Sequence, residues 1–119
     1  MYRDLNPDIF RQRLVIEGLY SENINAEMLK GYIEKLSKVI KMTIIYGPIV
    51  KNLAGKVFPH HAGFECQAIW AESGLSVYTW TNKKFFTVDI YTCKKFDVKD
   101  AVNFTKDYFK CKDIVWKEV

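Results

Sequence analysis

The stretch FECQAIWAESGLSVYTW, residues 64–80, decides the fold, because it is rich in strand-forming residues yet interrupted near its centre. It predicts either one long strand or two strands that divide at residues 72–74. A serine followed by a glycine inside a strand is typical of a bulge or a tight turn. The run FFTVDIYTC at 85–93 predicts a partner strand, joined by a hairpin turn within residues 81–84.

Three further strands are predicted outside this hairpin region. Residues 13–20 alternate in polarity, with one carboxylate held in an apolar segment. Residues 42–50 are β-branched and aromatic up to Gly47-Pro48, where the ladder must be interrupted or the strand must lie at an edge. The final run, residues 113–119, alternates as a terminal strand.

Two amphipathic helices are also predicted. Residues 26–40 carry apolar side chains at helical spacing, and Asn25 stands before them at the N-cap position. Residues 98–109 have the same spacing. Asp97 stands directly before them and Asp100 lies in their first turn, a pattern that resembles a capping box.

The predicted order is therefore β-α-β, a long hairpin region, and α-β. Because hairpins dominate, we expect an α+β fold in which an antiparallel β-sheet has two helices packed on one face. The other face then has no cover, and we expect a second copy of the chain to bury it, giving a homodimer. This expectation depends on apolar residues that we assign to the uncovered face: Phe64, Trp70, Val77, Phe85, Phe86 and Ile90.

Length and composition limit the class of protein. A chain of 119 residues with 49% hydrophobic residues suits one domain, residues 1–119. No stretch approaches the roughly 20 apolar residues that span a bilayer, and the N-terminal run MYRDLNPDIFRQR lacks the apolar region of a secretory signal. The three cysteines are too few and too widely spaced for a disulfide scaffold, so we expect a soluble, cytoplasmic protein with reduced thiols.

Nucleic-acid, membrane and metal partners are not expected. The net charge of +4 is spread along the chain, and the lysines beside aromatic residues at 82–86 and 93–96 are more typical of solvated strand edges than of a nucleic-acid surface. His60-His61 is the only histidine pair, and adjacent histidines in a loop do not usually both face one ion. No glycine-rich phosphate-binding motif is present.

The runs AESGLSVYTW and VDIYTC resemble the S-adenosylmethionine decarboxylase family in its short prokaryotic form, whose runs read E-S-H-L-S/T-I-H-T-W and V-D-x-F/Y-T-C. The distance from Ser73 to Cys93 also matches, and RLVIEG resembles the family's first strand. The resemblance implies that family's sandwich fold. Five residue pairs stand in the family's order: Glu72-Ser73, Leu75-Ser76, Thr79-Trp80, Val88-Asp89 and Thr92-Cys93.

This resemblance implies a self-processing enzyme of polyamine (spermidine) biosynthesis. In the family the serine attacks the carbonyl carbon of the preceding glutamate, and elimination and hydrolysis leave a pyruvoyl group, so the cut here falls between Glu72 and Ser73. The pyruvoyl carbonyl forms a Schiff base with the substrate amine and withdraws electrons as carbon dioxide leaves. Cys93 matches the general acid that returns a proton to the substrate carbon, and Glu17 corresponds to a substrate-facing carboxylate. The implied substrate is S-adenosylmethionine or a related amino acid.

Three positions depart from the family's pattern. Tyr78 stands in place of a histidine that assists elimination, and a phenol with a pKa of about 10 is a poorer base than an imidazole. Glu65 stands in place of a serine that helps processing, although its carboxylate could serve as a base. Gly74 replaces the histidine directly after Ser73 and loosens the backbone there.

These departures keep a second interpretation open, in which the chain is an uncleaved, non-catalytic homologue that retains the fold and the dimer and binds a ligand or a partner protein. Each site residue also has a purely structural interpretation. Cys93 fits a buried strand thiol, Tyr78 a core aromatic, and Glu65 and Glu72 solvated strand positions.

Overall fold

The computed structural model describes residues 2–54 and 62–119. His60 and His61 lie outside the described residues. None of the described helices is long and apolar enough to cross a membrane. The elements follow the predicted order: β1 (Gln12–Tyr20), α1 (Ala26–Val39), β2 (Ile44–Asn52), β3 (Phe64–Trp70), β4 (Ser73–Trp80), the 3-10 turn η1 (Thr81–Lys83), β5 (Phe85–Thr92), α2 (Val98–Phe109) and β6 (Cys111–Glu118).

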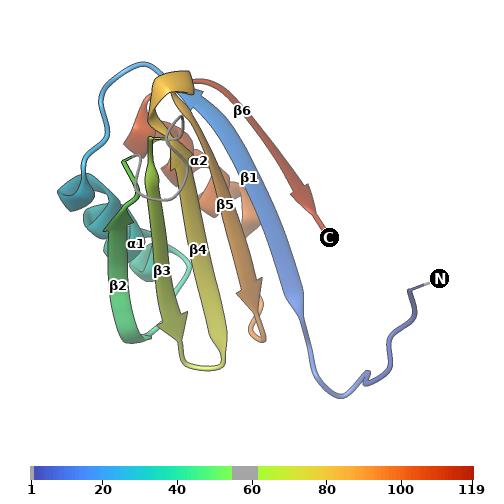
Figure 1. The fold of residues 1–119 in the computed structure, drawn as a ribbon. Helices are drawn as coiled ribbons and strands as arrows, with labels where there is room; N and C mark the ends of the chain where they lie inside the picture. The colour runs from blue at the N-terminus through green and yellow to red at the C-terminus, as the bar shows by residue number, and fades with distance from the viewer. Residues whose placement is uncertain (1, 55–61) are drawn as a thin grey trace.

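The six strands form one antiparallel sheet in the order β2-β3-β4-β5-β1-β6. Both helices lie behind the sheet in Figure 1, so the predicted α+β fold with two helices on one face is confirmed. The strand β2 lies at an edge, and its pairing with β3 shifts register between Ile44 and Ile49. Both consequences predicted for Gly47-Pro48 are therefore observed.

The opening stretch is two strands rather than one. Trp70 pairs with Ser73, so β3 and β4 are joined by the two-residue turn Ala71-Glu72. Glu72 has φ 65°, in the left-handed region that costs a residue with a Cβ about 1–2 kcal/mol. The division of the stretch into two strands is confirmed, but the predicted bulge or turn at Ser73-Gly74 is wrong, because both residues pair regularly at the start of β4 and the turn precedes them.

Both helices begin at the predicted N-caps. The Asn25 side chain accepts a hydrogen bond from the backbone N–H of Met28 at 2.9 Å. The Asp97 carboxylate accepts one from the backbone N–H of Asp100 at 3.0 Å. Each bond satisfies an amide that the first turn of a helix would otherwise leave unpaired, so the local sequence determines where the helices start.

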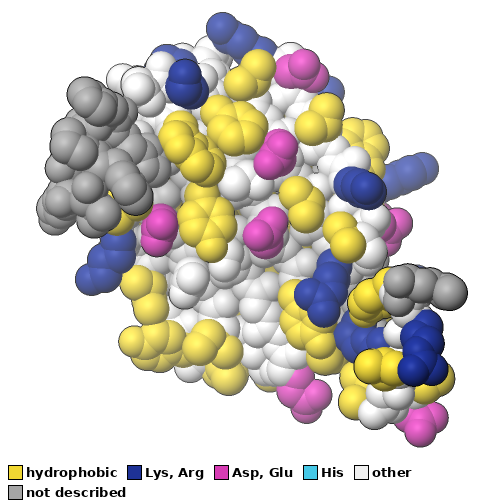
Figure 2. Space-filling view, turned by 45° about the vertical axis from the view of Figure 1, so that its right-hand side comes forward, with side chains coloured by type: hydrophobic (Ala, Val, Ile, Leu, Met, Phe, Trp, Pro, Cys, Tyr) yellow, Lys and Arg dark blue, Asp and Glu magenta, His cyan; other side chains and the backbone are white. Residues whose placement is uncertain are grey.

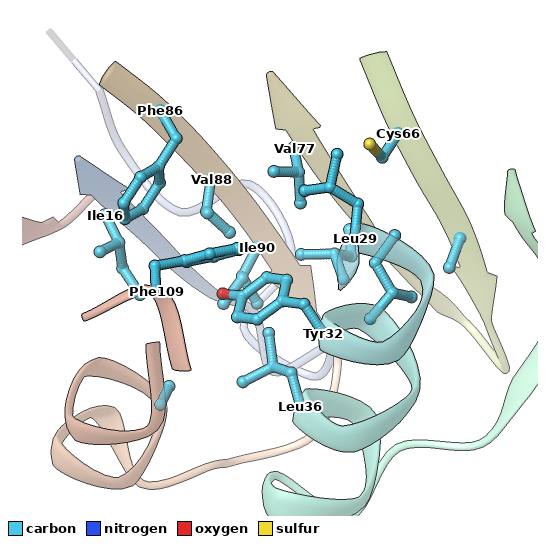
Figure 3. Packing of buried hydrophobic residues seen from close by; sticks show 14 of the residues in the cluster. Ile16, Leu29, Tyr32, Leu36, Cys66, Val77, Phe86, Val88, Ile90 and Phe109 are labelled. Atoms are coloured by element: carbon cyan, nitrogen blue, oxygen red, sulfur yellow. The ribbon is translucent and has the colours of Figure 1, made fainter. Parts of the chain in front are cut away.

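An aromatic cluster joins the helices to the sheet. Tyr32 of α1 and Phe109 of α2 have ring centroids 4.6 Å apart, and Phe109 lies 4.9 Å from Phe86 of β5 (Figure 3). A Cβ on Gly18 would come within 2.7 Å of the Phe86 ring, so the glycine in β1 makes room for that ring in the cluster.

The Tyr32 hydroxyl is buried and hydrogen-bonded to the Thr105 hydroxyl at 2.8 Å. Burial raises the pKa of Tyr32.

The assignment of apolar residues to the uncovered face was wrong for five of the six positions. Trp70, Val77, Phe86 and Ile90 are buried in the core under the helices, and Phe64 packs against that core. Side chains alternate between faces with a period of two, so each assignment depends on where a strand begins. The turn at residues 71–72 sets this alternation for β4.

The side of the sheet away from α1 and α2, called the open face below, carries a mixture of side chains. Figure 2 shows hydrophobic side chains interspersed with acidic ones over it. Because antiparallel neighbours in register share a face, the pairing of the four central strands defines its members. They are Arg13, Val15, Glu17 and Leu19 from β1; Glu65, Gln67 and Ile69 from β3; Gly74, Ser76, Tyr78 and Trp80 from β4; and Phe85, Thr87, Asp89 and Tyr91 from β5.

Candidate active site

Ser73 and Cys93 lie at the same end of the sheet. Ser73 begins β4, and Cys93 directly follows Thr92, the last residue of β5. Because the two strands are antiparallel neighbours, the start of one meets the end of the other. The backbone N–H of Cys93 donates a hydrogen bond to Ser73 Oγ at 3.1 Å, and both residues are half-buried. The fold thus brings together two residues that are twenty positions apart.

The Cys93 thiol contacts an aromatic side chain on the open face. Its Sγ lies 3.5 Å from the hydroxyl oxygen of Tyr91, and the Arg13 guanidinium lies 4.5 Å from the centroid of the Tyr91 ring. The other two free cysteines differ in their surroundings. Burial raises the pKa of Cys66 to about 12 and that of Cys111 to about 11, so both thiols ionise poorly at neutral pH.

Glu65, Tyr78 and Glu17 share one row across the open face. Glu65 of β3 pairs directly with Tyr78 of β4, which pairs with Thr87 of β5, which in turn pairs with Glu17 of β1. Tyr78 lies five residues along β4 from Ser73, which corresponds to about 17 Å at the rise of a strand. Within a single chain this row is therefore separated from Ser73 and Cys93.

A hollow of 460 Å³ lies on the open face beside the Ser73 end of the sheet. This volume is within the range of about 300–1,000 Å³ found for small-molecule sites. A Cβ on Gly74 would meet only a backbone oxygen at 3.8 Å, so glycine is not needed there for steric reasons, and its missing side chain widens the hollow. The polar lining comes from Arg13, Gln67, Ser76, Asp89 and Tyr91.

Arg13 and Tyr91 were not among the residues that the sequence indicated as part of the site. Their positions carried a usable signal, because Arg13 has the same strand alternation as Glu17, and Tyr91 stands two residues before Cys93. Their contact with each other depends on the pairing of β1 with β5, which the sequence did not predict.

The residues at this end fit a pyruvoyl group formed from the chain itself. Ser73 would supply its atoms, and the preceding carbonyl belongs to Glu72 in an exposed turn with left-handed backbone geometry. The hydrogen bond from Cys93 holds Ser73 Oγ in place. Neither Ser73 nor Cys93 lines the hollow, but it reaches Gly74, the residue after Ser73, and Tyr91, whose hydroxyl contacts Cys93.

The fold is shared with a solved structure, the crystal structure of the adenosylmethionine decarboxylase from Aquifex aeolicus VF5. The two superpose with a TM-score of 0.71 over 93% of this chain and 89% of the other, at 19% sequence identity. The sequence model of the S-adenosylmethionine decarboxylase family matches residues 17–119. The chain therefore belongs to the S-adenosylmethionine decarboxylase family.

Two curated relatives carry the names of proenzymes. The S-adenosylmethionine decarboxylase proenzyme of Clostridium botulinum (strain Loch Maree / Type A3) is 29% identical over 96 residues, which cover 80% of this chain and 77% of the relative. The arginine decarboxylase proenzyme of Ignicoccus hospitalis is 30% identical over 67 residues, covering 56% of this chain and 43% of the relative.

Proposed function

We propose that this protein is a decarboxylase proenzyme that cuts itself between Glu72 and Ser73 and then decarboxylates S-adenosylmethionine, or a related amino acid, in polyamine biosynthesis. The observation that carries the proposal is the hydrogen bond from the Cys93 N–H to Ser73 Oγ. This bond joins the serine that would form the pyruvoyl group to the residue expected to act as general acid. The proposal places the protein in the cytoplasm, where its three thiols stay reduced.

Self-cleavage begins when Ser73 Oγ attacks the carbonyl carbon of Glu72: the carbon–nitrogen bond breaks, the nitrogen takes up a proton, and an ester replaces the amide. Elimination then removes the Cα proton of residue 73 and breaks its Cβ–O bond, which releases the Glu72 carboxylate and cuts the chain. Hydrolysis of the remaining dehydroalanine releases ammonia and leaves the pyruvoyl group. Ser73 Oγ already accepts a hydrogen bond, so its own proton is free to pass to a base. The left-handed backbone of Glu72 adds local strain next to the bond that breaks.

In turnover, the pyruvoyl group supplies the electron sink for loss of carbon dioxide. The chain's own contribution is the Cys93 thiol, which returns a proton to the substrate carbon. Glu17 is expected to face the substrate from the open face. The relatives are named for two substrates, S-adenosylmethionine and arginine, so both are to be tested.

The separation of Tyr78 and Glu65 from Ser73 favours a dimer built through the open face. A two-fold axis that lies between the two open faces, parallel to them and perpendicular to the strands, brings the Ser73 end of one copy opposite the Tyr78 end of the other. Glu65 and Tyr78 of a second copy would then lie above Ser73 and Cys93. Such a dimer also covers apolar side chains such as Ile69, which is 50% exposed in the single chain.

The Thr87→Glu variant is expected to be monomeric. Thr87 lies between Tyr78 and Glu17, and a third carboxylate in this row must lose its hydration if a second copy packs there. Light scattering should give 14.0 kDa for the variant and twice that mass for the wild type. Asn103→Glu, on the exposed surface of α2, is the matched control and should remain dimeric. A dimeric Thr87→Glu protein would contradict the proposed interface.

The test of the function itself is the intact mass of the purified wild-type protein under denaturing conditions. Two fragments would establish the enzyme class: one that ends at Glu72, and one that begins at residue 73 and has the mass expected for a pyruvoyl group in place of Ser73. A single species of 14.0 kDa that persists on long incubation would instead favour the uncleaved homologue, whose supporting observation is that Tyr78, a poor base, stands where the family has a histidine. Assays with S-adenosylmethionine and arginine then identify the substrate.

The Tyr78→His variant should cleave faster than the wild type. An imidazole titrates near neutrality and is a far better base than a phenol, and a positioned base contributes about 100-fold to 10,000-fold. A time course of chain cleavage after synthesis measures the rate. Tyr46→His, on the exposed surface of the edge strand β2, controls for adding a histidine. An unchanged rate in Tyr78→His would show that Tyr78 does not limit cleavage.

A further inference from the structure

The contact between Tyr91 and Cys93 is not used by any step proposed above. Tyr91 lies on the open face, and its hydroxyl oxygen is 3.5 Å from Cys93 Sγ, within hydrogen-bond distance for sulfur. The phenol is therefore a direct neighbour of the thiol that is expected to give up a proton. A group at this place can change both the position of the thiol and the stability of its ionised form.

The Tyr91 ring is supported from one side and open on the other. Arg13 of β1 pairs with Tyr91 in register, and its guanidinium lies 4.5 Å from the ring centroid, a cation–π contact. On the other flank Tyr91 pairs with Gly74, which has no side chain. The ring is thus anchored towards β1, while the hollow opens on the side of β4.

The Tyr91 hydroxyl keeps its proton at neutral pH and can therefore act as a donor. The hydrogen bond with Cys93 is the main reason that the pKa of Tyr91 is raised above its usual value of 10.0. Arg13 and Arg11 oppose this shift, since their positive charges favour the phenolate. A protonated phenol beside a thiolate donates its hydrogen bond to sulfur, and bonds to charged groups are stronger than bonds between neutral ones.

We propose that Tyr91 is a positioning residue for Cys93: its hydroxyl donates a hydrogen bond to Sγ, holds the thiol beside the Tyr91 side chain that lines the hollow, and stabilises the thiolate left when Cys93 gives its proton to the substrate carbon. Arg13 keeps the ring in the orientation that this bond requires. The role in turnover rests on the proposed decarboxylase function, whereas the effect of Tyr91 on the thiol does not depend on it.

Alkylation by iodoacetamide tests the effect on the thiol directly. In Tyr91→Phe the thiolate loses its donor, so Cys93 should be alkylated about fivefold to tenfold more slowly near pH 7.5, consistent with the loss of one hydrogen bond to a charged group. Tyr46→Phe, which removes a hydroxyl from the exposed edge strand, should react like the wild type.

The measurement does not depend on whether the chain is cleaved. Cys93 is present in the full chain and in residues 73–119, so denaturing mass spectrometry reads its alkylation in each form separately. Cys66 and Cys111 react later, because burial raises their pKa to about 12 and about 11. Superimposable rate profiles for wild type and Tyr91→Phe, in either form, would overturn the proposal.

A second readout applies to the cleaved, active enzyme. Tyr91→Phe should lower kcat about fivefold to tenfold and leave KM unchanged, because the hydrogen bond matters most once the proton has moved. A purely structural role would lower the melting temperature without moving the alkylation profile, and that result would count against the proposal. If the wild type is never cleaved, the alkylation result still decides the role of Tyr91 on its own.

Discussion

The Ser73→Ala protein should remain a single chain under conditions in which the wild type separates into two. The alanine has no hydroxyl to attack the Glu72 carbonyl, so the amide cannot become an ester and no elimination can follow. The effect should be complete rather than partial, because the neighbouring residues Ala71, Glu72 and Gly74 carry no hydroxyl or thiol that could replace Ser73. Denaturing mass spectrometry after long incubation measures it.

A control variant and a test of folding accompany the Ser73→Ala measurement. Ser21→Ala removes a hydroxyl from an exposed bend after β1 and should cleave at the wild-type rate. Circular dichroism of Ser73→Ala should match that of the uncleaved wild type, since the variant loses only a half-buried hydroxyl and its hydrogen bond from the Cys93 N–H. Normal two-chain product from Ser73→Ala would exclude Ser73 as the nucleophile.

The Cys93→Ala protein should cleave normally and yet fail in turnover. The contact with Ser73 Oγ comes from the backbone N–H of residue 93, which alanine retains, so the cleavage site is preserved. The thiol proton is lost, and removing a positioned general acid costs about 100-fold to 10,000-fold in rate. The readouts are intact mass for cleavage and release of carbon dioxide for turnover.

Cys111→Ala is the matched control for this variant. Cys111 is half-buried at the start of β6, and it lies outside the site that Ser73 and Cys93 form. Its removal should leave both cleavage and turnover near wild-type values. Full decarboxylase activity in Cys93→Ala would remove that residue from the mechanism, whereas loss of cleavage would show that its side chain also takes part in processing.

The local structure could largely be predicted from the sequence. Asn25 and Asp97 cap the two helices as expected, because a cap depends only on residues three positions apart. The division of residues 64–80 into two strands was also anticipated, although the turn is Ala71-Glu72 and not Ser73-Gly74. The fold class followed from the order of these elements.

The long-range features could not be predicted in the same way. The face on which Trp70, Val77 and Phe86 lie depends on strand alternation, and an offset of one residue reverses every assignment. The resemblance to a known family placed Ser73 and Cys93 in one site, and their contact in the structure is consistent with it. The motif's spacing places Tyr78 five residues along a strand from Ser73, but it gave no indication that Glu65, Tyr78 and Glu17 share one row.

By itself, the sequence determined the elements, their order, the helix caps and the chemical groups available, because these depend on neighbouring residues and on residue type. Only the tertiary structure decided that the hydroxyl of Tyr91 meets Cys93, that Arg13 supports the ring, and that Tyr78 and Glu65 form a separate row. The physical reason for the last two is that they arise from the register between strands, and register is set by the packing of the whole sheet against its helices. The Tyr91–Cys93 contact joins residues two positions apart and depends on how the chain leaves the end of β5.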